Sequence, residues 1–390
     1  MRRLLLLVAA VVFVDTMLFV ALTPLLPHFT REFGLSKFSA GVLTASYAVG
    51  ALLGGLPGGF AAVRIGPRRA VLVGLALMGV ASIGFALANS FSTLLAARVL
   101  QGCGSAFTWA GAFSWLLAAA PRSRRGELIG VAMGAAVVGA LFGPVVGAAA
   151  AIVGRTVIFC ALAGVAALLA IRTLLTPAPT VHEPAGGPVI RAFANPRLAS
   201  GFALLSMASL LAGVLSVLGP LHLAAVGWSA SAIGAVWLLS AALEAAASPF
   251  IGRVSDRRGA LVPVRFALAA AALLSSMLAL AGRPLLYAPL VLLASIAYGI
   301  LFTPAFALIA DGAEHAGLAQ GHAFGVMNAV WALGAMLGPL AAGAIAGVSG
   351  DWLVYVLATA LCVGTLVAIR GSARRQSARH PLTAPPHRTV

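Results

Sequence analysis

Three ionisable side chains stand inside long apolar stretches of the sequence, namely Asp15, Arg98 and Glu244. A charged side chain at the centre of a bilayer costs roughly 2.5–3.5 kcal/mol on insertion scales, so each of them needs a reason to be there. A carboxyl group in such a place can exchange a proton or bind a cationic or polar molecule. We therefore expect Asp15 to alternate between these two partners. The alternative is that Asp15 and Arg98 form a static ion pair, which would only hold the helices together.

Glu244 permits two interpretations of equal weight. It lies in the run of small residues AALEAAA at 241–247, and a helix of such residues can pack closely against a neighbour. Glu244 is then either a second proton site or a neutral acid that hydrogen-bonds to the adjacent helix.

Other polar and aromatic side chains fall at similar positions within apolar stretches. Arg98, Gly102, Ser105 and Trp109 share one helix face by their spacing of three and four residues, so Trp109 could meet a bound molecule. For any single aromatic residue the simpler interpretation is ordinary packing or a place in an interfacial belt. The candidates for a central cavity are Tyr47, Gln101, Ser105, Trp109, Tyr298, Asn328 and Trp331.

The composition indicates that these side chains lie in a membrane. Of the 390 residues 61% are hydrophobic and 9% are charged, with a mean hydropathy of +1.05, whereas soluble domains carry about 25% charged residues. The net charge of +16 does not indicate nucleic-acid binding, because the arginines form short clusters between apolar runs and no basic-aromatic module is present. Phosphate-loop and metalloprotease spacings are also absent, so we expect no cofactor, no metal and no nucleic-acid partner.

The pattern of apolar runs predicts an all-α membrane protein with twelve spanning helices, since one span needs about 20 mostly apolar residues. The predicted spans are residues 4–27, 39–62, 70–89, 91–118, 127–151, 156–175, 198–222, 230–252, 261–281, 284–310, 322–347 and 351–370.

The positive charges predict the orientation, because they collect on the cytoplasmic side of a membrane protein. Both termini are expected in the cytoplasm, which leaves few positive charges outside: Arg31, Lys37, Arg155 and Arg283. Asp15 then lies roughly 16 Å, and Arg98 roughly 20 Å, above the inner face of a core about 30 Å thick. The two side chains could therefore interact near the midplane.

The longest polar interruption, from about Thr176 to Arg197, contains five prolines and predicts a cytoplasmic linker. It separates an N-terminal six-helix bundle (1–175) from a C-terminal one (198–370); the linker itself is 176–197 and a cytoplasmic tail follows at 371–390.

Lys37 is the only lysine, and alanine and glycine are frequent, as in proteins from GC-rich bacteria. We expect a monomer in a bacterial inner membrane.

Two sequence patterns recur half a chain apart. The spacing G-x8-G-x3-G-P of the fifth span returns in the eleventh, 195 residues later (Gly139 against Gly334), and the loop after the second span is matched after the eighth, 193 residues later (Gly59 against Gly252). Glycine lets helices approach and proline permits bending, so we expect these stretches to form seams on which two duplicated halves move. The residues assigned to gating and helix seams are Gly59, Gly66, Arg68, Gly130, Gly139, Gly143, Pro144, Gly252, Asp256, Arg257, Gly259, Gly334, Gly338 and Pro339.

These motifs together resemble the major facilitator superfamily, specifically its twelve-span drug:proton antiporter branch. The loop after span two is similar to that family's G-x3-D-R-x-G-R-R signature, and R-V-L-Q-G-x3-A at 98–106 looks like its R-x2-Q-G-x3-A motif. Span five carries the Gly-Pro signature associated with antiporters, and span one, from Asp15 to Pro27, looks like the start of that branch. The resemblance covers nearly the whole chain and implies that spans one, four, seven and ten line a central cavity.

The loop signature departs from the family at one position. The family's loop aspartate is replaced by Val63 in the first copy and is present as Asp256 in the second. The resemblance implies that this carboxylate caps a helix N-terminus of the opposite half, a contact worth about 0.3–1 kcal/mol, and so stabilises the outward-facing state. The replacement puts the first-half contact in doubt.

The expected function is that of a proton-coupled secondary active transporter, not an enzyme, that exports a small amphipathic compound, which can be cationic, by alternating access. No ATP site is visible, so an ion gradient must supply the energy. A proton-coupled uptake symporter for a small metabolite is the alternative, and the Gly-Pro signature argues against it by resemblance only. A non-transporting sensor or scaffold is disfavoured because the loops are too short to hold a partner domain.

Overall fold

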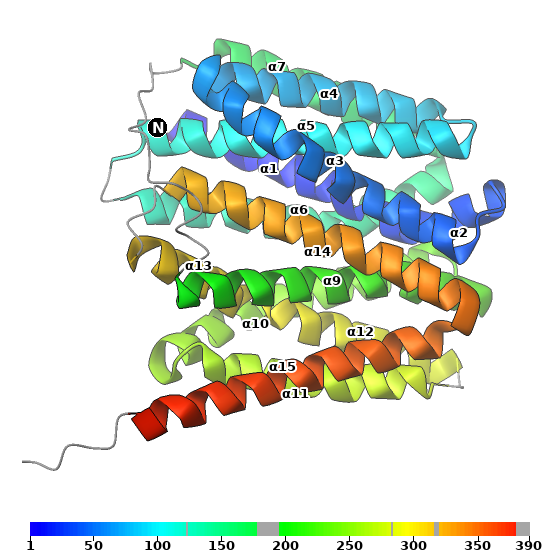
Figure 1. The fold of residues 1–390 in the computed structure, drawn as a ribbon. Coiled ribbons are helices and arrows are strands. Elements are labelled where there is room, and N and C mark those ends of the chain that lie inside the picture. The colour runs from blue at the N-terminus through cyan, green and yellow to red at the C-terminus, as the bar shows by residue number, and fades with distance from the viewer. Residues whose placement is uncertain (122–123, 178–194, 282–283, 316–319, 380–390) are drawn as a thin grey trace, which may run out of the picture.

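The computed structural model describes residues 1–121, 124–177, 195–281, 284–315 and 320–379, and within these ranges the regular elements are α-helices (Figure 1). They are α1 (Arg2–Val20), α2 (Leu22–Glu32), α3 (Lys37–Arg64), α4 (Pro67–Leu87), α5 (Phe91–Ala119), α6 (Arg125–Val153), α7 (Arg155–Leu175), α9 (Pro196–Ala225), α10 (Ala230–Arg258), α11 (Leu261–Ala279), α12 (Pro284–Ile300), α13 (Phe302–His315), α14 (Gln320–Ser349) and α15 (Asp351–Arg379).

Two of the spans are interrupted, and proline explains both interruptions. The first span breaks at Ala21 between α1 and α2, and another breaks at Leu301 between α12 and α13. Proline has no N–H to donate to the carbonyl four residues earlier. Pro24 and Pro304 therefore leave the carbonyls of Val20 and Ile300 without that partner, and these are the last residues of α1 and α12.

In the described part of the chain, eleven helical segments are long and apolar enough to cross a membrane, counting each interrupted pair as one. The remaining long helix, α5, has 29 residues. Its composition falls short because it carries polar side chains at Arg98, Gln101, Ser105, Thr108 and Trp109. With α5 included, the all-α fold of twelve long helices predicted from the sequence is confirmed.

The helix packing repeats along the chain. α1 packs on α6 as α9 packs on α14, α3 packs on α5 as α10 packs on α12, and α4 packs on α7 as α11 packs on α15. The helices α1 to α7 form the first set and α9 to α15 the second. Between the two sets the main contacts are α3 with α14 and α6 with α10, and these two contacts correspond to each other in the repeat. The repeat seen in the sequence is therefore also a repeat in the packing.

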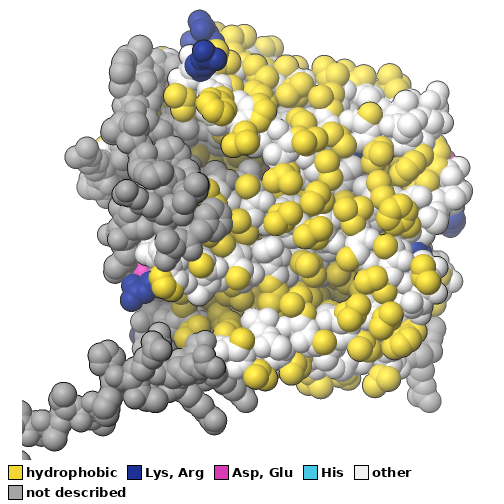
Figure 2. Space-filling view, viewed as in Figure 1, with side chains coloured by type: hydrophobic (Ala, Val, Ile, Leu, Met, Phe, Trp, Pro, Cys, Tyr) yellow, Lys and Arg dark blue, Asp and Glu magenta, His cyan; other side chains and the backbone are white. Residues whose placement is uncertain are grey.

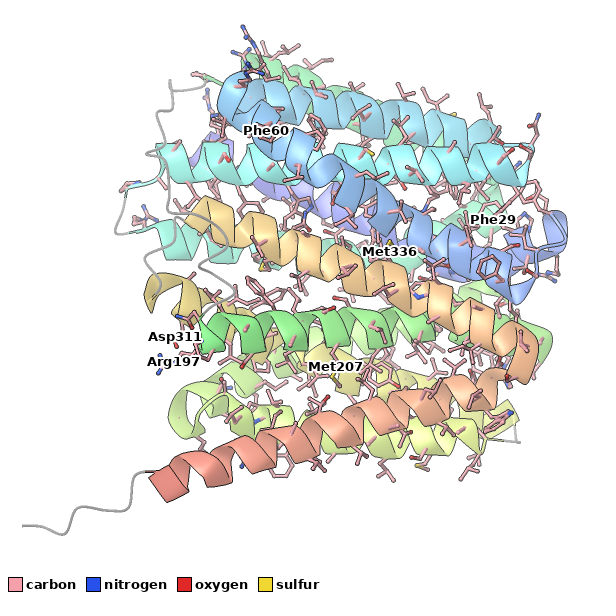
Figure 3. The ribbon with its side chains drawn as sticks, in the orientation of Figure 1. Phe29, Phe60, Arg197, Met207, Asp311 and Met336 are labelled. Atoms are coloured by element: carbon pink, nitrogen blue, oxygen red, sulfur yellow. The ribbon has the colours of Figure 1, made fainter. Side chains whose placement is uncertain are left out.

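The two ends of the molecule differ in what they hold. One end carries Arg197 and Asp311, and the other carries Phe29 (Figure 3); we call them the Arg197 end and the Phe29 end. Between them, hydrophobic side chains cover much of the visible face, and the Lys and Arg side chains that can be seen lie near the ends (Figure 2). Large apolar side chains are exposed within the helices, such as Leu53 of α3 at 63% and Leu273 of α11 at 62%. An apolar belt of this kind suits contact with lipid.

Helix boundaries agree with the predicted spans to within a few residues at most ends, with two clear exceptions. α10 continues to Arg258, six residues past its predicted end, and α15 continues to Arg379 instead of ending near residue 370. No proline interrupts the chain between Asp351 and Pro381, so nothing forbids the longer helix. The predicted linker lies almost wholly in 178–194, and the end of the predicted tail in 380–390, both outside the described residues.

Candidate functional site

Asp15 is enclosed by hydrogen-bond donors from two neighbouring helices. Its side chain is 2% exposed, in the middle of α1. The Tyr47 hydroxyl of α3 donates to Oδ1 at 3.1 Å, while the Ser105 hydroxyl and the Trp109 indole N–H of α5 donate to Oδ2 at 2.9 and 2.6 Å. All three donors are neutral. They can hold a carboxylate in place without neutralising it, and the nearest cation of the protein, Arg98, stays one side chain away over the Tyr47 ring, so a proton or a bound cation can still pair with Asp15 directly.

Arg98 does not contact Asp15 directly, contrary to one possibility raised by their matching depth. Its Nη1 donates to the carbonyl of Leu18 at 3.1 Å and to Gln101 Oε1 at 2.7 Å, and its Nη2 donates to the carbonyl of Phe19 at 3.2 Å. Those carbonyls lie in the last turn of α1, where a helix end leaves carbonyls without intrahelical partners. The break in the first span therefore supplies the acceptors that the guanidinium uses.

Tyr47 connects Arg98 with Asp15. The Arg98 guanidinium lies 5.0 Å from the centre of the Tyr47 ring, whose hydroxyl binds Asp15. A cation over an aromatic face is attracted to it. The buried arginine thus fixes the ring that carries one of the three donors. Gln101, 1% exposed, accepts from Arg98 Nη1 and so orients the guanidinium.

An aromatic contact extends from this site to the other set of helices. The Phe19 ring packs on Tyr47 at 4.9 Å between centroids and on Trp331 of α14 at 5.2 Å, edge to face. Phe19 follows Asp15 by four residues, so both lie on one face of α1, about 6 Å apart along the axis. Phe19 is not among the residues predicted from the sequence, although its spacing from Asp15 was a usable signal.

Neither of the two remaining cavity candidates, Tyr298 and Asn328, hydrogen-bonds to Asp15. Tyr298 is 1% exposed and hydrogen-bonds to the Ser275 hydroxyl of α11 at 2.7 Å, so it serves packing among α11 and α12. Asn328 is half-buried on α14, three residues before Trp331. The structure therefore brings together Tyr47, Ser105 and Trp109 around the carboxylate and adds Trp331 through Phe19.

Removing only the Tyr47 hydroxyl tests its role. We expect Tyr47→Phe to lower gradient-driven transport roughly tenfold or more, because a hydrogen bond to a charged group contributes about 1.5–3 kcal/mol, while the ring still packs on Arg98 and Phe19. Tyr298→Phe is the matched control, since it deletes an equally buried hydroxyl away from Asp15, and it should transport normally. Equal rates for the two variants would show that Tyr47 acts only by packing. Flux in proteoliposomes is the measurement.

Glu244 occupies a seam between α10 and α12. The side chain is half-buried, and its carboxyl group lies against Gly299, so closely that a Cβ at residue 299 would collide with it. The corresponding seam of the first half, between α3 and α5, holds Gly102 against Tyr47 and Ala51. Glu244 thus puts a carboxyl group into a seam whose counterpart carries no acid.

A double-mutant cycle tests this placement. Gly299→Ala should lower the stability of the protein by about 1–3 kcal/mol, because the added methyl overpacks the seam. Adding Glu244→Ala should recover most of that loss, since the two groups compete for one space. Gly164→Ala, where no atom would lie within 4 Å of the added methyl, controls for glycine replacement in a helix. Thermal unfolding in detergent reports on every variant. A loss that Glu244→Ala does not reduce would place the carboxyl group elsewhere.

The Gly-Pro stretches lie at close helix contacts. In α6, Gly139 and Gly143 face Phe13 and Met17 of α1, and in α14, Gly334 and Gly338 face Ser206 and Leu210 of α9. These four glycines therefore close seams inside each set of helices. Gly130, by contrast, has open space beside it.

The two prolines of these stretches contact the opposite set. A Cβ on Gly41 of α3 would meet the Pro339 carbonyl of α14, and a Cβ on Gly234 of α10 would meet the Pro144 carbonyl of α6. Gly41 and Gly234 each lie near the start of their helix, and both helices contact α2, the helix of Phe29 at the Phe29 end. The two sets of helices are thus in backbone contact at that end.

The residues of the loop signature lie where α3 and α10 end. Gly59 and Gly252 are inside these helices, whereas Gly66 (φ 91°) and Gly259 (φ 84°) adopt the positive φ that lets the chain turn into the next helix. Arg257 is exposed in the last turn of α10.

The remaining positions of the loop signature differ between the two copies. The Arg68 guanidinium donates to the carbonyl of Leu174 at the end of α7, which satisfies a C-terminal carbonyl of that helix. Val63, which replaces the family's aspartate, is 77% exposed. The side chain of Asp256 lies outside the described residues, so its expected capping contact stays a prediction.

A duplicated bundle of long apolar helices with a polar site buried midway along them defines a class, the polytopic membrane proteins built like secondary transporters. The family follows from the sequence match: the chain belongs to the Major Facilitator Superfamily, whose model matches residues 6–322. This is a family of membrane transporters, so its membership confirms the prediction that the chain is not an enzyme.

Individual relatives are distant and match only part of the chain. The MFS-type transporter ppzB of Metarhizium majus is 31% identical over 35% of this chain and 31% of its own length. The probable nitrate/nitrite transporter NarK2 of Mycobacterium tuberculosis is 35% identical over 33% of each chain. The quinolone resistance protein NorA of Staphylococcus aureus is 26% identical over 32% of each. The chain thus matches about a third of the length of these curated relatives.

Solved structures share the fold over nearly the whole chain. A bacterial homologue of the human lysosomal transporter Spinster, in an inward-facing and unoccupied conformation, superposes with a TM-score of 0.76 at 18% identity, covering 98% of both chains. The nucleoside transporter NupG superposes with a TM-score of 0.74 at 16% identity, covering 94% of this chain and 98% of its own. At such identities the likeness establishes the fold alone.

Proposed function

We propose that the protein is a proton-coupled antiporter that exports small amphipathic compounds, cations included. The observation that carries this proposal is the Asp15 carboxyl group, buried amid three neutral donors in the middle of a membrane helix. A lone carboxylate is costly there unless a proton or a cation neutralises it. Exchange of one for the other links the movement of the two.

The proposed cycle is alternating access. Two bundles, 1–175 and 198–370, rock about the site, and the segment 176–197 joins them. The Phe29 end is assigned to the outside and the Arg197 end to the cytoplasm of a bacterial inner membrane, with both termini cytoplasmic and one chain as the working unit. Backbone contact at the Phe29 end supports an arrangement in which the outer side is closed. A proton arriving from outside neutralises Asp15, releases the solute outward and leaves on the cytoplasmic side.

NorA is named for quinolone resistance and NarK2 for nitrate and nitrite transport, so the similarity does not fix one solute, and the direction of coupling is the property to test. The wild-type protein is reconstituted into vesicles, and a fluorescent amphipathic cation, ethidium, is added under an imposed pH gradient. An antiporter accumulates the dye on the acidic side in either orientation of the protein, whereas a symporter moves it to the alkaline side. Accumulation on the alkaline side would establish uptake symport. Dye movement equal to that of empty vesicles under the same pH gradient would exclude proton-coupled transport of this cation.

A further inference from the structure

A cluster of charged side chains joins the two sets of helices at the Phe29 end. The Lys37 ammonium of α3 binds Asp351 Oδ1 of α15 at 2.5 Å. Nδ1 of His222, from α9, lies 3.7 Å from the other carboxylate oxygen, Oδ2. One carboxylate therefore has two basic neighbours, of which Lys37 belongs to the first set of helices and His222 to the same set as Asp351.

The helices hold these groups in position. Asp351 is the first residue of α15, where the helix dipole favours a negative charge, and His222 is in the last turn of α9, where it favours a positive one. Gly350, with φ 84°, turns the chain from α14 into α15. A Cβ on Gly343 of α14 would meet the backbone carbonyl of Lys37, so the two backbones touch beside the ion pair.

Two tyrosines belong to the same cluster, and α2, which also packs on α9, carries Arg31 and Glu32, of which Glu32 pairs with Arg155. The His222 ring stacks on Tyr287 of α12 at 3.8 Å between centroids, with an interplanar angle of 23°. The hydroxyls of Tyr287 and Tyr355 bond to each other at 2.6 Å. The charges that act on His222 in this cluster are therefore those of Asp351 and Lys37. The side chains of His222 and Lys37 remain 30% and 40% exposed, open to protons from solution.

We propose that His222 and Asp351 form a proton-operated latch at the outer end of the protein. With His222 neutral, Asp351 binds Lys37 and holds the outer ends of the two bundles together. With His222 protonated, Asp351 has a cationic partner within its own bundle and releases Lys37, so external acid opens the outer side. Of the proposed function, this inference uses only the rocking of the two bundles and the assignment of the Phe29 end to the outside.

The sign follows from mutual repulsion of the two cations. In the closed arrangement a proton on His222 is repelled by the Lys37 ammonium across the shared carboxylate. When the bundles separate, Lys37 withdraws and the carboxylate serves His222 alone, so the proton binds more strongly to the open form. A ligand that binds one form more strongly shifts the population toward it. Falling pH must then favour opening.

A distance measurement between spin labels tests the latch. Labels are attached to Leu87→Cys at the end of α4 and Val348→Cys at the end of α14, both exposed and at the Phe29 end, after Cys103, Cys160 and Cys362 are replaced by serine. In lipid nanodiscs the ratio of long to short distances should rise about two- to fivefold between about pH 8 and about pH 5, which corresponds to about 0.4–1 kcal/mol, within the range of a partly exposed ion pair.

Variants of the cluster separate its parts. Lys37→Gln should raise the fraction of long distances already at the higher pH. His222→Gln and His222→Phe should both retain short distances at the lower pH; the phenylalanine keeps the stacking on Tyr287 and controls for lost packing. His28→Gln is the matched control, because His28 lies 3.4 Å from Glu32 on the same helix and joins no two bundles. It should respond as the wild type does.

Two results would overturn the latch: a full acid response in both His222 variants, or unchanged distances in Lys37→Gln. The measurement is repeated in Asp15→Asn, where the acid response should persist. The acid response is measured as a distance between labels and does not require transport of ethidium. The latch can therefore be confirmed or refuted whatever the vesicle experiment shows, so failure of the transport proposal and failure of the latch are distinguishable.

Discussion

Asp15→Asn should abolish the accumulation of ethidium on the acidic side of vesicles, leaving at most about a tenth of the wild-type initial rate above empty vesicles. An amide cannot take up or lose a proton in the working pH range, so the site can no longer exchange H⁺ for a cation. The variant keeps the size of the side chain. Its oxygen can take the place of Oδ2 and accept from Trp109 and Ser105, while its NH2 group donates to the Tyr47 hydroxyl oxygen, which can accept as well as donate, so the fold should be kept.

Two controls distinguish lost coupling from lost folding. Asp15→Glu restores an ionisable group and should recover part of the gradient-driven rate. Asp311→Asn removes an exposed carboxylate that pairs with Arg197 at the Arg197 end, and it should transport at the wild-type rate (Figure 3). If Asp15→Asn accumulates the dye as well as the wild type, Asp15 is not the coupling group. Glu244→Gln, assayed in parallel, then decides whether the acid in the α10–α12 seam has that role.

Gly41→Leu should stop the cycle by keeping the outer side open. Even a Cβ at residue 41 would meet the carbonyl of Pro339 and the Cα of Gly343 on α14. Overpacking a contact of this kind costs about 1–3 kcal/mol, and separation of the bundles relieves it, so the closed form should become roughly 5- to 150-fold less populated. We expect the transport rate to fall by a similar factor and the distance between labels at residues 87 and 348 to lengthen.

Gly55→Leu supplies the matched control, since residue 55 lies on the same helix and no atom would lie within 4 Å of its Cβ. Both variants should unfold at temperatures close to that of the wild type, because neither alters packing within its own bundle. Normal transport by Gly41→Leu, with short distances retained, would show that the α3–α14 seam yields and does not govern closure.

The interrupted spans show how far the sequence could be interpreted. The apolar runs located the first and tenth spans, and Pro24 and Pro304 explain where each breaks, because the missing N–H acts four residues back along the same chain. The sequence did not predict which side chain would bind the carbonyls that the first break leaves free. That Arg98 would bind the carbonyls it leaves at Leu18 and Phe19 depends on α5 lying beside α1.

The candidate site divides in the same way. Periodicity placed Ser105 and Trp109 on one face of α5, and the structure brings both to Asp15. Tyr298 was grouped with them by its depth in the membrane, whereas its hydroxyl bonds to Ser275 of α11. Depth along a helix follows from residue spacing, but the direction in which a side chain points relative to the other helices does not.

The class of protein, the duplication and the identity of the costly buried charges all follow from the order of residues along the chain. These properties are local, since hydropathy accumulates along each helix and a repeat is visible as spacing. The partners of those charges, in contrast, became known from the folded arrangement: three neutral donors instead of Arg98 around Asp15, and an ion pair between Lys37 and Asp351, 314 residues apart. Contacts between helices depend on which faces meet in three dimensions, and the residue pattern of one helix does not predict which helix packs against it.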